Sequence, residues 1–347
     1  MTSRFVLILA GGRGERFWPW SRPDRPKQLL PLASGGRTLL RATYDRARRV
    51  AEPERILVMT AMDLREACQR ECPGATILGE PVARNTAAAI AAAAAWIGDE
   101  QAFAVMPADH AIDDEAAFAA DLARGFELAE RERVLVTFGI RPTGPETNFG
   151  YIRRGAKLAE RLHRVAQFTE KPDRARAAEW VASGDYAWNG GIFVWRRGVF
   201  FDALEAGRPA IAAALRGFQF PRSPEGFSNA LREVFPALES ISVDYAVLEH
   251  APNVVVIEAS FDWDDLGSWG AWARRQSRDA RGNVLFGDTI AIDCERCVVV
   301  GEGGVAAAMG LRDMVVVHAG GATLSCRLED SDRVRQVSEA ARARVRG

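Results

Sequence analysis

The first chemistry that the chain offers is a glycine-rich loop surrounded by positive charge. Gly11, Gly12 and Gly14 directly follow the apolar run Phe5–Ala10. Glycine lets the backbone approach a ligand closely, and successive backbone N–H groups before a helix form an anion site. Five cations follow, offset in part by Glu15 and Asp24: Arg13, Arg16, Arg22, Arg25 and Lys27. This local excess of positive charge fits a polyphosphate, although a tight turn with solvated arginines would use the same residues.

Two common phosphate-binding patterns do not fit this loop. The dinucleotide pattern G-x-G-x-x-G, counted from Gly12, needs a third glycine where Phe17 stands. The P-loop pattern ends in Gly-Lys-Ser/Thr, which this loop does not contain. Neither of these two patterns therefore accounts for the loop.

The elements that must position the loop alternate between strands and helices. Four short apolar runs predict buried strands: Phe5–Leu9, Arg55–Met59, Ala102–Met106 and Arg133–Phe138. Helices are expected between and after them, at Thr38–Val50, Asp63–Glu71, Thr86–Ile97 and Glu115–Glu130. This alternation predicts an α/β fold with a Rossmann-like, mixed but mainly parallel sheet flanked by helices. Ligands in such folds bind at the carboxyl ends of the strands.

The last part of the chain has a different character. Short β-rich runs follow one another without helices between them: Asn283–Ile292, Cys297–Val300, Val305–Met309, Met314–Val317 and Ala322–Leu328. They predict a small β-solenoid-like unit, closed by an amphipathic helix over residues 332–345. We therefore expect an α/β domain over residues 1–280 and a β-rich domain over residues 281–347.

The overall composition is that of a globular protein with no strong charge bias. The chain has 347 residues, 48% of them hydrophobic, and a formal net charge of −1. This balance favours neither nucleic acid nor an anionic membrane surface as a partner. The first apolar run is too short for a signal sequence, and no run reaches the roughly 18 apolar residues of a membrane span. We expect a soluble, cytoplasmic protein.

The cysteines favour neither a disulfide scaffold nor a zinc site. The chain has five cysteines, which is an odd number, and it is too long to belong to the small disulfide-stabilised proteins. Cys294 and Cys297 form a CxxC pair, but a zinc site needs a second pair or two histidines, and neither is near in the sequence. We interpret both as plain strand cysteines.

The glycine-rich loop resembles the signature of the sugar-nucleotidyltransferase family, G-G-x-G-x-R-L-x-P-L followed by P-K. The segment Gly11–Trp20 carries the first part, with apolar Phe17 and Trp20 in place of leucines, and Pro26–Lys27 the second. The resemblance continues over nearly the whole chain, in particular to the mannose-1-phosphate guanylyltransferase branch. It implies nucleotide binding by Gly11, Gly12, Arg13 and Gly14, and catalytic roles for Arg16 and Lys27.

A second segment, Gly79–Ala87, is similar to the part of the family that holds the base. Guanine presents N–H donors that the Glu80 carboxylate or the Asn85 amide could accept, and Arg84 could pair with phosphate. The resemblance adds Thr86 to this nucleotide-binding set. Alternatively, Asn85 or Thr86 only caps the helix that follows.

Three further loops resemble the family's sugar site. They imply sugar binding by Gly150, Glu170 and Asn189, and contact between Lys171 and the phosphate of the sugar 1-phosphate. Relatives usually carry Gly-Tyr where this chain has Asn148 and Phe149, which leaves the fine sugar selectivity open. Each loop on its own could equally be structural.

The resemblance also implies a magnesium site. Asp109 follows a predicted strand, and Asp265 lies in a segment that resembles the family pattern W-x-D-x-G-x-W. These two aspartates are expected to hold Mg²⁺, whereas Asp262 and Asp264 are expected to be solvated. The segment Ser242–Glu249 is typical of the guanylyl members and is interpreted as mostly structural.

Together these resemblances imply transfer of GMP from GTP to mannose 1-phosphate, giving GDP-mannose and pyrophosphate. Two alternatives stay open: a relative that uses another base or sugar, and a non-catalytic homologue that senses a GDP-sugar. We also expect a homodimer to which residues 282–347 contribute, since exposed strand edges tend to be paired. Because the chain ends at Gly347, we expect no isomerase activity of the kind fused to many relatives.

Overall fold

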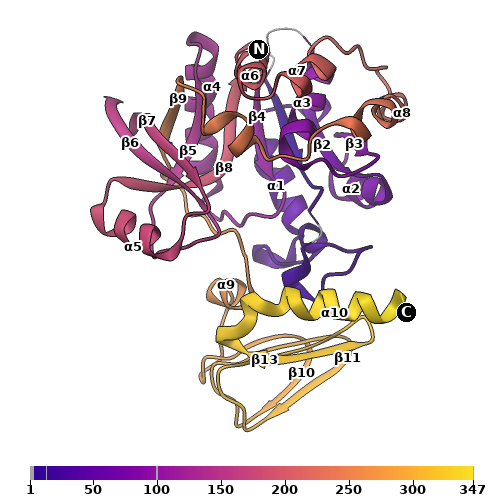
Figure 1. Cartoon of the computed structure of the whole chain (residues 1–347). Coiled ribbons are helices and arrows are strands. Elements are labelled where there is room, and N and C mark those ends of the chain that lie inside the picture. Colours follow the sequence, from indigo (N-terminus) through magenta and orange to yellow (C-terminus); the bar gives the residue numbers. More distant parts are fainter. Residues whose placement is uncertain (1–3, 13, 99–100, 347) are drawn as a thin grey trace. The chain divides into compact units, whose positions relative to one another are not determined.

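The structure is a computed structural model that describes residues 4–12, 14–98 and 101–346 (Figure 1). The chain divides into two compact units, and each unit is made from separate stretches of sequence. The first consists of Met1–Gly11, Thr43–Ala108 and Ile112–Trp263, and the second of Gly12–Ala42, Asp109–Ala111 and Asp264–Gly347. None of the described helices combines the length and hydropathy needed to cross a bilayer.

The first unit is built on one nine-stranded sheet with the order β3-β2-β1-β4-β8-β5-β9-β7-β6. Its strands are β1 (Phe5–Leu9), β2 (Ile56–Ala61), β3 (Thr76–Glu80), β4 (Ala102–Pro107), β5 (Leu135–Ile140), β6 (Gly150–Ala159), β7 (Leu162–Glu170), β8 (Tyr186–Arg196) and β9 (Val254–Glu258). Strands β3, β2, β1 and β4 run parallel, as do β5 and β9, whereas β8 lies antiparallel between β4 and β5. This mixed sheet confirms the predicted fold class.

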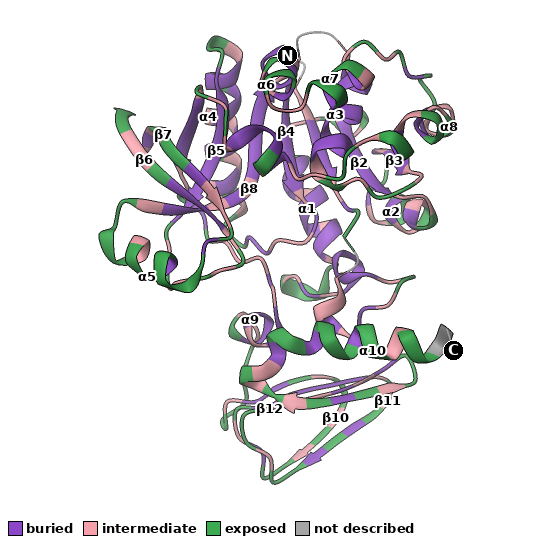
Figure 2. Ribbon diagram, viewed as in Figure 1, coloured by how far each residue is buried: buried purple, intermediate pink, exposed green. Residues whose placement is uncertain are grey.

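Helices cover the sheet of the first unit, and its central strands are buried (Figure 2). The helices of this unit are α2 (Arg65–Glu71), α3 (Asn85–Ile97), α4 (Glu115–Arg131), α5 (Arg174–Ser183), α6 (Arg197–Gly207), α7 (Pro209–Leu215) and α8 (Pro224–Val234). Helix α1 (Leu39–Ala47) links the second unit to the first along the chain. A π-helix, η7 (Asp244–Leu248), precedes β9.

Helix α3 shows how sequence sets packing in this unit. Every residue from Ala87 to Ile97 is buried. The helix therefore has no solvent-facing stripe, as expected for a segment that is apolar all round. Alanine side chains allow it to pack closely on β1 and β2.

The elements expected from the sequence are present in the first unit with small changes at their ends. The predicted helices Thr38–Val50 and Asp63–Glu71 are shorter, because α1 covers Leu39–Ala47 and α2 begins at Arg65. The strand predicted at Arg133–Phe138 begins two residues later, as β5. The ends of helices and strands are the parts that local pattern fixes least well.

The second unit contains a four-stranded sheet with the order β10-β11-β12-β13. Its strands are β10 (Val284–Ile292), β11 (Val298–Met309), β12 (Met314–Ala319) and β13 (Ala322–Arg327). The first three run parallel as successive coils, and β13 returns antiparallel through Gly320 and Gly321, both with positive φ. The two runs predicted at Cys297–Val300 and Val305–Met309 form the single strand β11. The closing helix is confirmed as α10 (Val334–Arg346).

Residues from the start of the chain complete the core of the second unit. Trp20 stacks on Trp269 of α9 (Trp269–Arg274) with ring centroids 5.8 Å apart, and lies 4.9 Å from Phe286 of β10. Trp20 Nε1 donates to Glu302 Oε2 at 2.7 Å. Glu15 accepts from Arg342 of α10. The β-rich strands therefore share one core with a segment about 260 residues earlier in the sequence.

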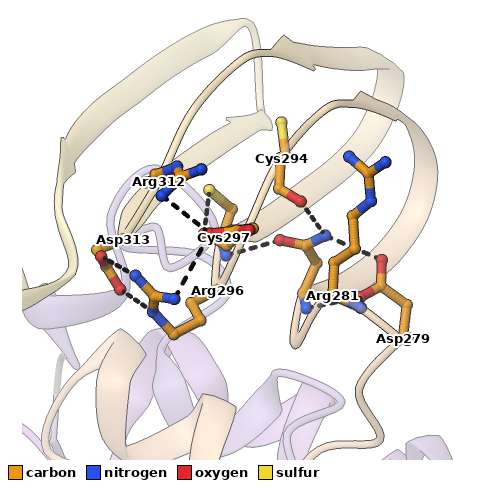
Figure 3. A network of polar contacts seen from close by, with 9 residues as sticks. Asp279, Arg281, Cys294, Arg296, Cys297, Arg312 and Asp313 are labelled. Carbon is orange, nitrogen blue, oxygen red and sulfur yellow. Dashed lines mark hydrogen bonds and ion pairs between the residues drawn. The ribbon is translucent and has the colours of Figure 1, made fainter.

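The corners of the coils are held by polar contacts (Figure 3). The side chain of buried Asn283 donates to Asp279 Oδ2 and to the Cys294 carbonyl, and accepts from Cys297 N, at 2.9 Å each. Arg296 donates twice to Asp313, at 2.7 Å. Cys294 and Cys297 are buried at this corner, and no metal-binding cluster of His, Cys, Asp or Glu occurs among the described residues. Both lie between β10 and β11, in a turn rather than in a strand.

Candidate active site

The structure brings the expected site residues together in two groups, one in each compact unit. The second unit holds Gly12 and Gly14 of the glycine-rich loop, Arg16, Lys27 and the two candidate metal aspartates, whereas Gly11 ends a stretch of the first unit. The first unit holds the base segment and the three sugar loops. Arg13 lies outside the described residues.

The glycine-rich loop is closed by contact between Gly14 and Lys27. Gly14 has φ 59°, and a Cβ atom added there would lie 2.2 Å from Lys27 Cβ. Only glycine fits this position, because both the φ angle and the space exclude a side chain. Gln28 Nε2 donates to the Gly12 carbonyl at 2.9 Å and ties the same two stretches together. Arg16 follows in the short 3₁₀ helix η1 (Glu15–Phe17).

Lys27 is the centre of the second-unit group. Lys27 is buried, with 7% of its surface exposed. Its Nζ donates one hydrogen bond to Asp109 Oδ2 at 2.8 Å and another to the backbone carbonyl of Asp265. Burial works to raise the pKa of the Asp109 carboxyl, but Lys27 and then His110 bring it below its ordinary value. Lys27 thus joins the loop to both segments that carry the candidate metal ligands.

Asp109 and Asp265 are brought close by pairing of their own segments. Ala111 N donates to the Asp264 carbonyl at 2.9 Å, and Asp264 N donates back to Ala111 at 3.0 Å. Burial raises the pKa of Asp265 to about 6, against the effect of Lys27, and the charges of Asp264 and Asp109 add to the rise. A guanidinium nitrogen of Arg16 is on the same side, since a Cβ on Gly267 would lie 3.3 Å from it and 3.0 Å from Asp265 Oδ2.

These carboxylates fit a small hard cation. Their mutual repulsion would be relieved by a divalent ion, and Mg²⁺ is commonly bound by one or two carboxylates together with substrate phosphates. Asp264 Oδ1 instead accepts from Leu266 N at 2.8 Å. Asp262 Oδ1 accepts from Asp113 N and Asp114 N, at 2.9 and 2.7 Å. Asp262 is exposed, as expected, although its Oδ1 also accepts from the backbone, whereas Asp264 is only partly exposed.

The base segment lies at the carboxyl end of β3 and the start of α3. Glu80 ends β3, and a Cβ on Gly11 would lie 3.6 Å from Glu80 Oε2. Burial raises the pKa of Glu80 to about 7. Asn85, with φ 63°, accepts from Thr86 N at 2.8 Å through its own Oδ1. Arg84 donates to the carbonyls of Phe235 and Pro236, so these contacts anchor its guanidinium in the free protein.

The sugar loops meet around Glu170. Its carboxylate lies 2.9 Å from Lys171 Nζ. A Cβ on Gly150 would lie 2.6 Å from Glu170 Oε2 and 3.3 Å from Asn189 Cβ, so the three predicted sugar ligands are neighbours. Although burial works to lower the pKa of Lys171, Glu170 raises it and keeps the ammonium charged. Phe149, which replaces the family's tyrosine, packs its ring on Trp188 at 5.0 Å.

Two acidic residues that the sequence left as structural also belong to this group. Asp244 and Glu249, at the two ends of the π-helical segment, accept hydrogen bonds from Asn189 Nδ2 and Glu170 N at 3.0 and 3.1 Å. Their acidity within a segment typical of guanylyl members was the available signal. No local pattern indicated that they would face the sugar loops.

With this geometry established, comparison with known proteins defines the class. Residues 5–281 match the nucleotidyl transferase family, and the chain belongs to that family. Residues 287–340 match a mannose-phosphate isomerase/GMP-like β-helix domain, which agrees with the coils β10–β12.

Particular relatives match over nearly the whole chain. The xanthan biosynthesis protein XanB of Xanthomonas campestris is 38% identical over 98% of this chain and 73% of its own length. A mannose-1-phosphate guanylyltransferase of Escherichia coli is 37% identical over 96% of this chain and 73% of its own. A solved structure from Thermus thermophilus, described as a mannose-1-phosphate geranyltransferase, has a TM-score of 0.87 at 38% identity and covers 98% of this chain and 100% of its own.

Proposed function

We propose that this protein transfers GMP from GTP to mannose 1-phosphate and releases pyrophosphate. The observation that carries the proposal is the identity of 36–37% over at least 94% of the chain to several proteins named as mannose-1-phosphate guanylyltransferases. Two groups of side chains support the proposal. They are basic residues for phosphates, carboxylates for a cation and for guanine, and polar groups for a sugar.

The proposed reaction is a displacement at the α-phosphorus of GTP. An oxygen of the sugar 1-phosphate attacks, a new P–O bond forms, and the bond to the β-phosphate breaks with pyrophosphate as the leaving group. The nucleophile is already an anion, so the protein needs no general base. Its work is to position the two phosphates and to offset their charge.

Each group of side chains has a proposed role in that work. Arg16 and Lys27, with the backbone of the glycine-rich loop, hold the triphosphate, and Lys171 aligns the sugar phosphate as a compact point charge. Glu80, with Asn85 and Thr86, holds guanine. Glu170, Asn189 and the bare backbone at Gly150 hold the sugar hydroxyls.

We propose Mg²⁺ as the cofactor, held by Asp109 and Asp265. When bound, the ion would neutralise phosphate charge that would otherwise oppose the approach of two anions. Lys27 already holds one carboxylate oxygen of Asp109 at 2.8 Å, and it orients that side chain.

The substrate assignment is tested by turnover with a panel of nucleotides and sugar 1-phosphates. We expect kcat/KM to be highest for GTP with mannose 1-phosphate. Higher kcat/KM with another base or sugar would identify a different member of the family. Binding of GDP-mannose without turnover of any pair would instead support a non-catalytic sensor.

Domain boundaries, assembly and location complete the proposal. A catalytic domain over residues 1–280 and a β-rich domain over 281–347 agree with the two family matches, although the compact units assign residues 12–42 and 264–280 to the second core.

We propose a homodimer through β10 and β11, where five large apolar side chains are exposed: Leu285, Ile290, Ile292, Val305 and Met309. The mass in solution of the Met309→Asp variant tests it. Because GTP and a sugar phosphate are charged metabolites of the cell interior, we propose a cytoplasmic location.

A further inference from the structure

One segment of the first unit, residues 241–249, contacts both the base segment and the sugar loops. Its centre is the π-helix η7 (Asp244–Leu248). Single π-helical turns are rare and recur at functional sites. The proposed reaction so far assigns no role to this segment.

The start of the segment contacts the amino end of α3. Val243 N donates to Thr86 Oγ1 at 2.9 Å. Ala87 N donates to the Ile241 carbonyl at 3.2 Å. The segment is therefore fixed to Thr86, one of the proposed guanine ligands, and to Ala87, which follows it.

The two ends of the π-helical turn contact the sugar loops. Asn189 Nδ2 donates to Asp244 Oδ1 at 3.0 Å, and Glu170 N donates to Glu249 Oε1 at 3.1 Å. One short segment thus supplies a carboxylate behind each of two proposed sugar ligands.

The hydrogen bond between Asn189 and Asp244 fixes the orientation of the Asn189 side-chain amide. Its Oδ1 accepts from Thr137 Oγ1 at 3.0 Å and from Gly191 N at 3.2 Å. One amide hydrogen is used by Asp244. If the Asn189 amide were flipped, its oxygen would face the Asp244 carboxylate and its NH₂ group would face the N–H of Gly191. Both contacts would be lost, so the observed orientation is strongly preferred. Among the described residues, the second amide hydrogen has no acceptor.

Asp244 occupies an unfavourable place for a carboxylate with only a structural role. Burial raises its pKa to about 7, and the nearby charge of Glu170 adds to the rise, although Lys171 partly offsets it. Carboxyl groups with such perturbed surroundings cluster at functional sites. The hydrogen bond from Asn189 places the group within the sugar site rather than in the general core.

We propose that Asp244 is a positioning residue for the sugar: it holds Asn189 so that an amide N–H points toward a hydroxyl of the sugar 1-phosphate. The inference rests on the proposed function, since it takes Asn189 to be a sugar ligand. Asp244 acts through Asn189 and does not itself touch the reacting phosphates.

The test is a double-mutant cycle between Asp244 and Asn189, measured in the full chain with GTP and mannose 1-phosphate. We expect Asp244→Ala to raise KM for mannose 1-phosphate about 10- to 100-fold, the range for loss of a hydrogen bond to a charged group, and KM for GTP less than about threefold. Asp244→Asn keeps an acceptor for Asn189 and should restore most of the affinity. Glu239→Gln is the matched control, because this carboxylate of the preceding loop is exposed and pairs with Arg208.

The cycle separates positioning from a general structural role. In the Asn189→Ala background, Asp244→Ala should raise KM for the sugar phosphate by no more than about threefold, since its partner is already gone. If the two effects multiply, or if Asp244→Ala leaves KM unchanged while Asn189→Ala raises it, the inference is wrong and the proposed sugar site stands. If Asn189→Ala itself changes nothing, the proposed sugar site fails and the inference fails with it. Asp244→Leu, of similar volume, replaces Asp244→Ala in the cycle if that variant does not fold.

Discussion

At the scale of single residues, the carboxyl groups of the candidate site differ in what surrounds them. Although partial desolvation works to raise it, Lys27 holds the pKa of Asp109 low, whereas burial raises the pKa of Asp265 to about 6 and that of Glu80 to about 7. The same side-chain chemistry can therefore serve a cation in one place and a base in another. The sequence nominated each of these residues for the site, but the environment of each depends on distant partners, such as Lys27 and Asp109, which are 82 positions apart.

Glu80 should make nucleotide affinity depend on pH. Guanine donates N–H groups, so it binds the ionised carboxylate, which is the minor form below its pKa of about 7 in the free protein. We expect KM for GTP to fall roughly tenfold as the pH rises from 6 to 8, beyond any change caused by titration of the nucleotide. Steady-state kinetics at saturating sugar phosphate measure it.

Glu80→Gln is the control for this pH effect. The amide does not titrate, so the variant should show only the pH dependence that belongs to GTP itself. Stability should respond in the opposite sense. Because the folded state binds the Glu80 proton more tightly than the unfolded state, the free energy of unfolding should decline as the pH rises from about 4.5 to 7. If KM for GTP and the free energy of unfolding depended on pH in Glu80→Gln as they do in the parent, the assignment would be contradicted.

The two metal candidates make a prediction of their own. Asp109→Asn and Asp265→Asn keep the shape and lose the charge, and each should reduce turnover at least about 100-fold, equivalent to roughly 3 kcal/mol of barrier. The double variant should be little worse than either, since both serve one ion. Turnover as a function of magnesium concentration is the measurement.

Asp264→Asn is the matched variant for the metal prediction. Its Oδ1 accepts from Leu266 N, a contact that the amide oxygen can keep, so turnover should stay within about threefold of the parent. A severe defect in Asp264→Asn beside a normal Asp265→Asn would show that the ligand is the neighbouring residue. Full activity in all three single variants would remove the metal assignment.

At the scale of elements, the turn between β1 and η1 is the most constrained. Gly14→Ala places a side chain at φ 59° and 2.2 Å from Lys27 Cβ, so the loop or Lys27 must move. We expect a loss of stability of at least about 1–2 kcal/mol, together with a raised KM for GTP. Denaturant unfolding and steady-state kinetics test both.

Gly12→Ala isolates the steric part of that effect on stability. Apart from its chain neighbours, a Cβ at Gly12 meets no atom of the described residues within 4 Å, so the free energy of unfolding of Gly12→Ala should stay within about 0.5 kcal/mol of the parent. Equal destabilisation by both substitutions would mean that the space around Gly14 is not the cause.

The elements themselves were largely predictable, and the exceptions have physical reasons. Apolar runs predicted β1, β2 and β4, and the alanine run predicted α3, because period and length are local properties. The antiparallel insertion of β8 between β4 and β5 depends on long-range pairing, which no local run records. The π-helical turn at Asp244–Leu248 likewise has no periodic signal of its own.

At the scale of the whole molecule, the β-rich segment and residues 12–42 form one core. Removal of residues 282–347 would uncover Phe17, Trp20 and Leu30, which are now fully buried against that segment. We therefore expect the truncated chain to be insoluble or inactive, rather than an intact smaller enzyme. Expression of residues 1–281, followed by solubility and turnover assays, decides the outcome.

Trp20→Ala tests the same core without removing any chain. Loss of a fully buried tryptophan should cost about 3–5 kcal/mol, and it leaves Glu302 without its indole donor. Val337→Ala, at an exposed position on α10, is the reference and should cost less than about 0.5 kcal/mol. Similar stability of the two variants would show that Trp20 does not hold the unit together.

The sequence predicted the two classes of structure but not how the chain is shared between the cores. A change of texture near residue 280 indicated a separate β-rich part. Trp20 and Phe17, however, were interpreted as replacements for leucines in a loop signature, and their burial beside Trp269 is visible only in three dimensions.

The central claim is that the sugar phosphate attacks the α-phosphorus of GTP. The most direct test follows mannose 1-phosphate labelled with ¹⁸O in its phosphate, incubated with GTP, Mg²⁺ and the purified chain, by ³¹P NMR. We expect all of the label in the sugar-proximal phosphate of GDP-mannose and its bridge to the α-phosphorus, and none in pyrophosphate. Label in pyrophosphate, or no GDP-mannose at all, would contradict the account.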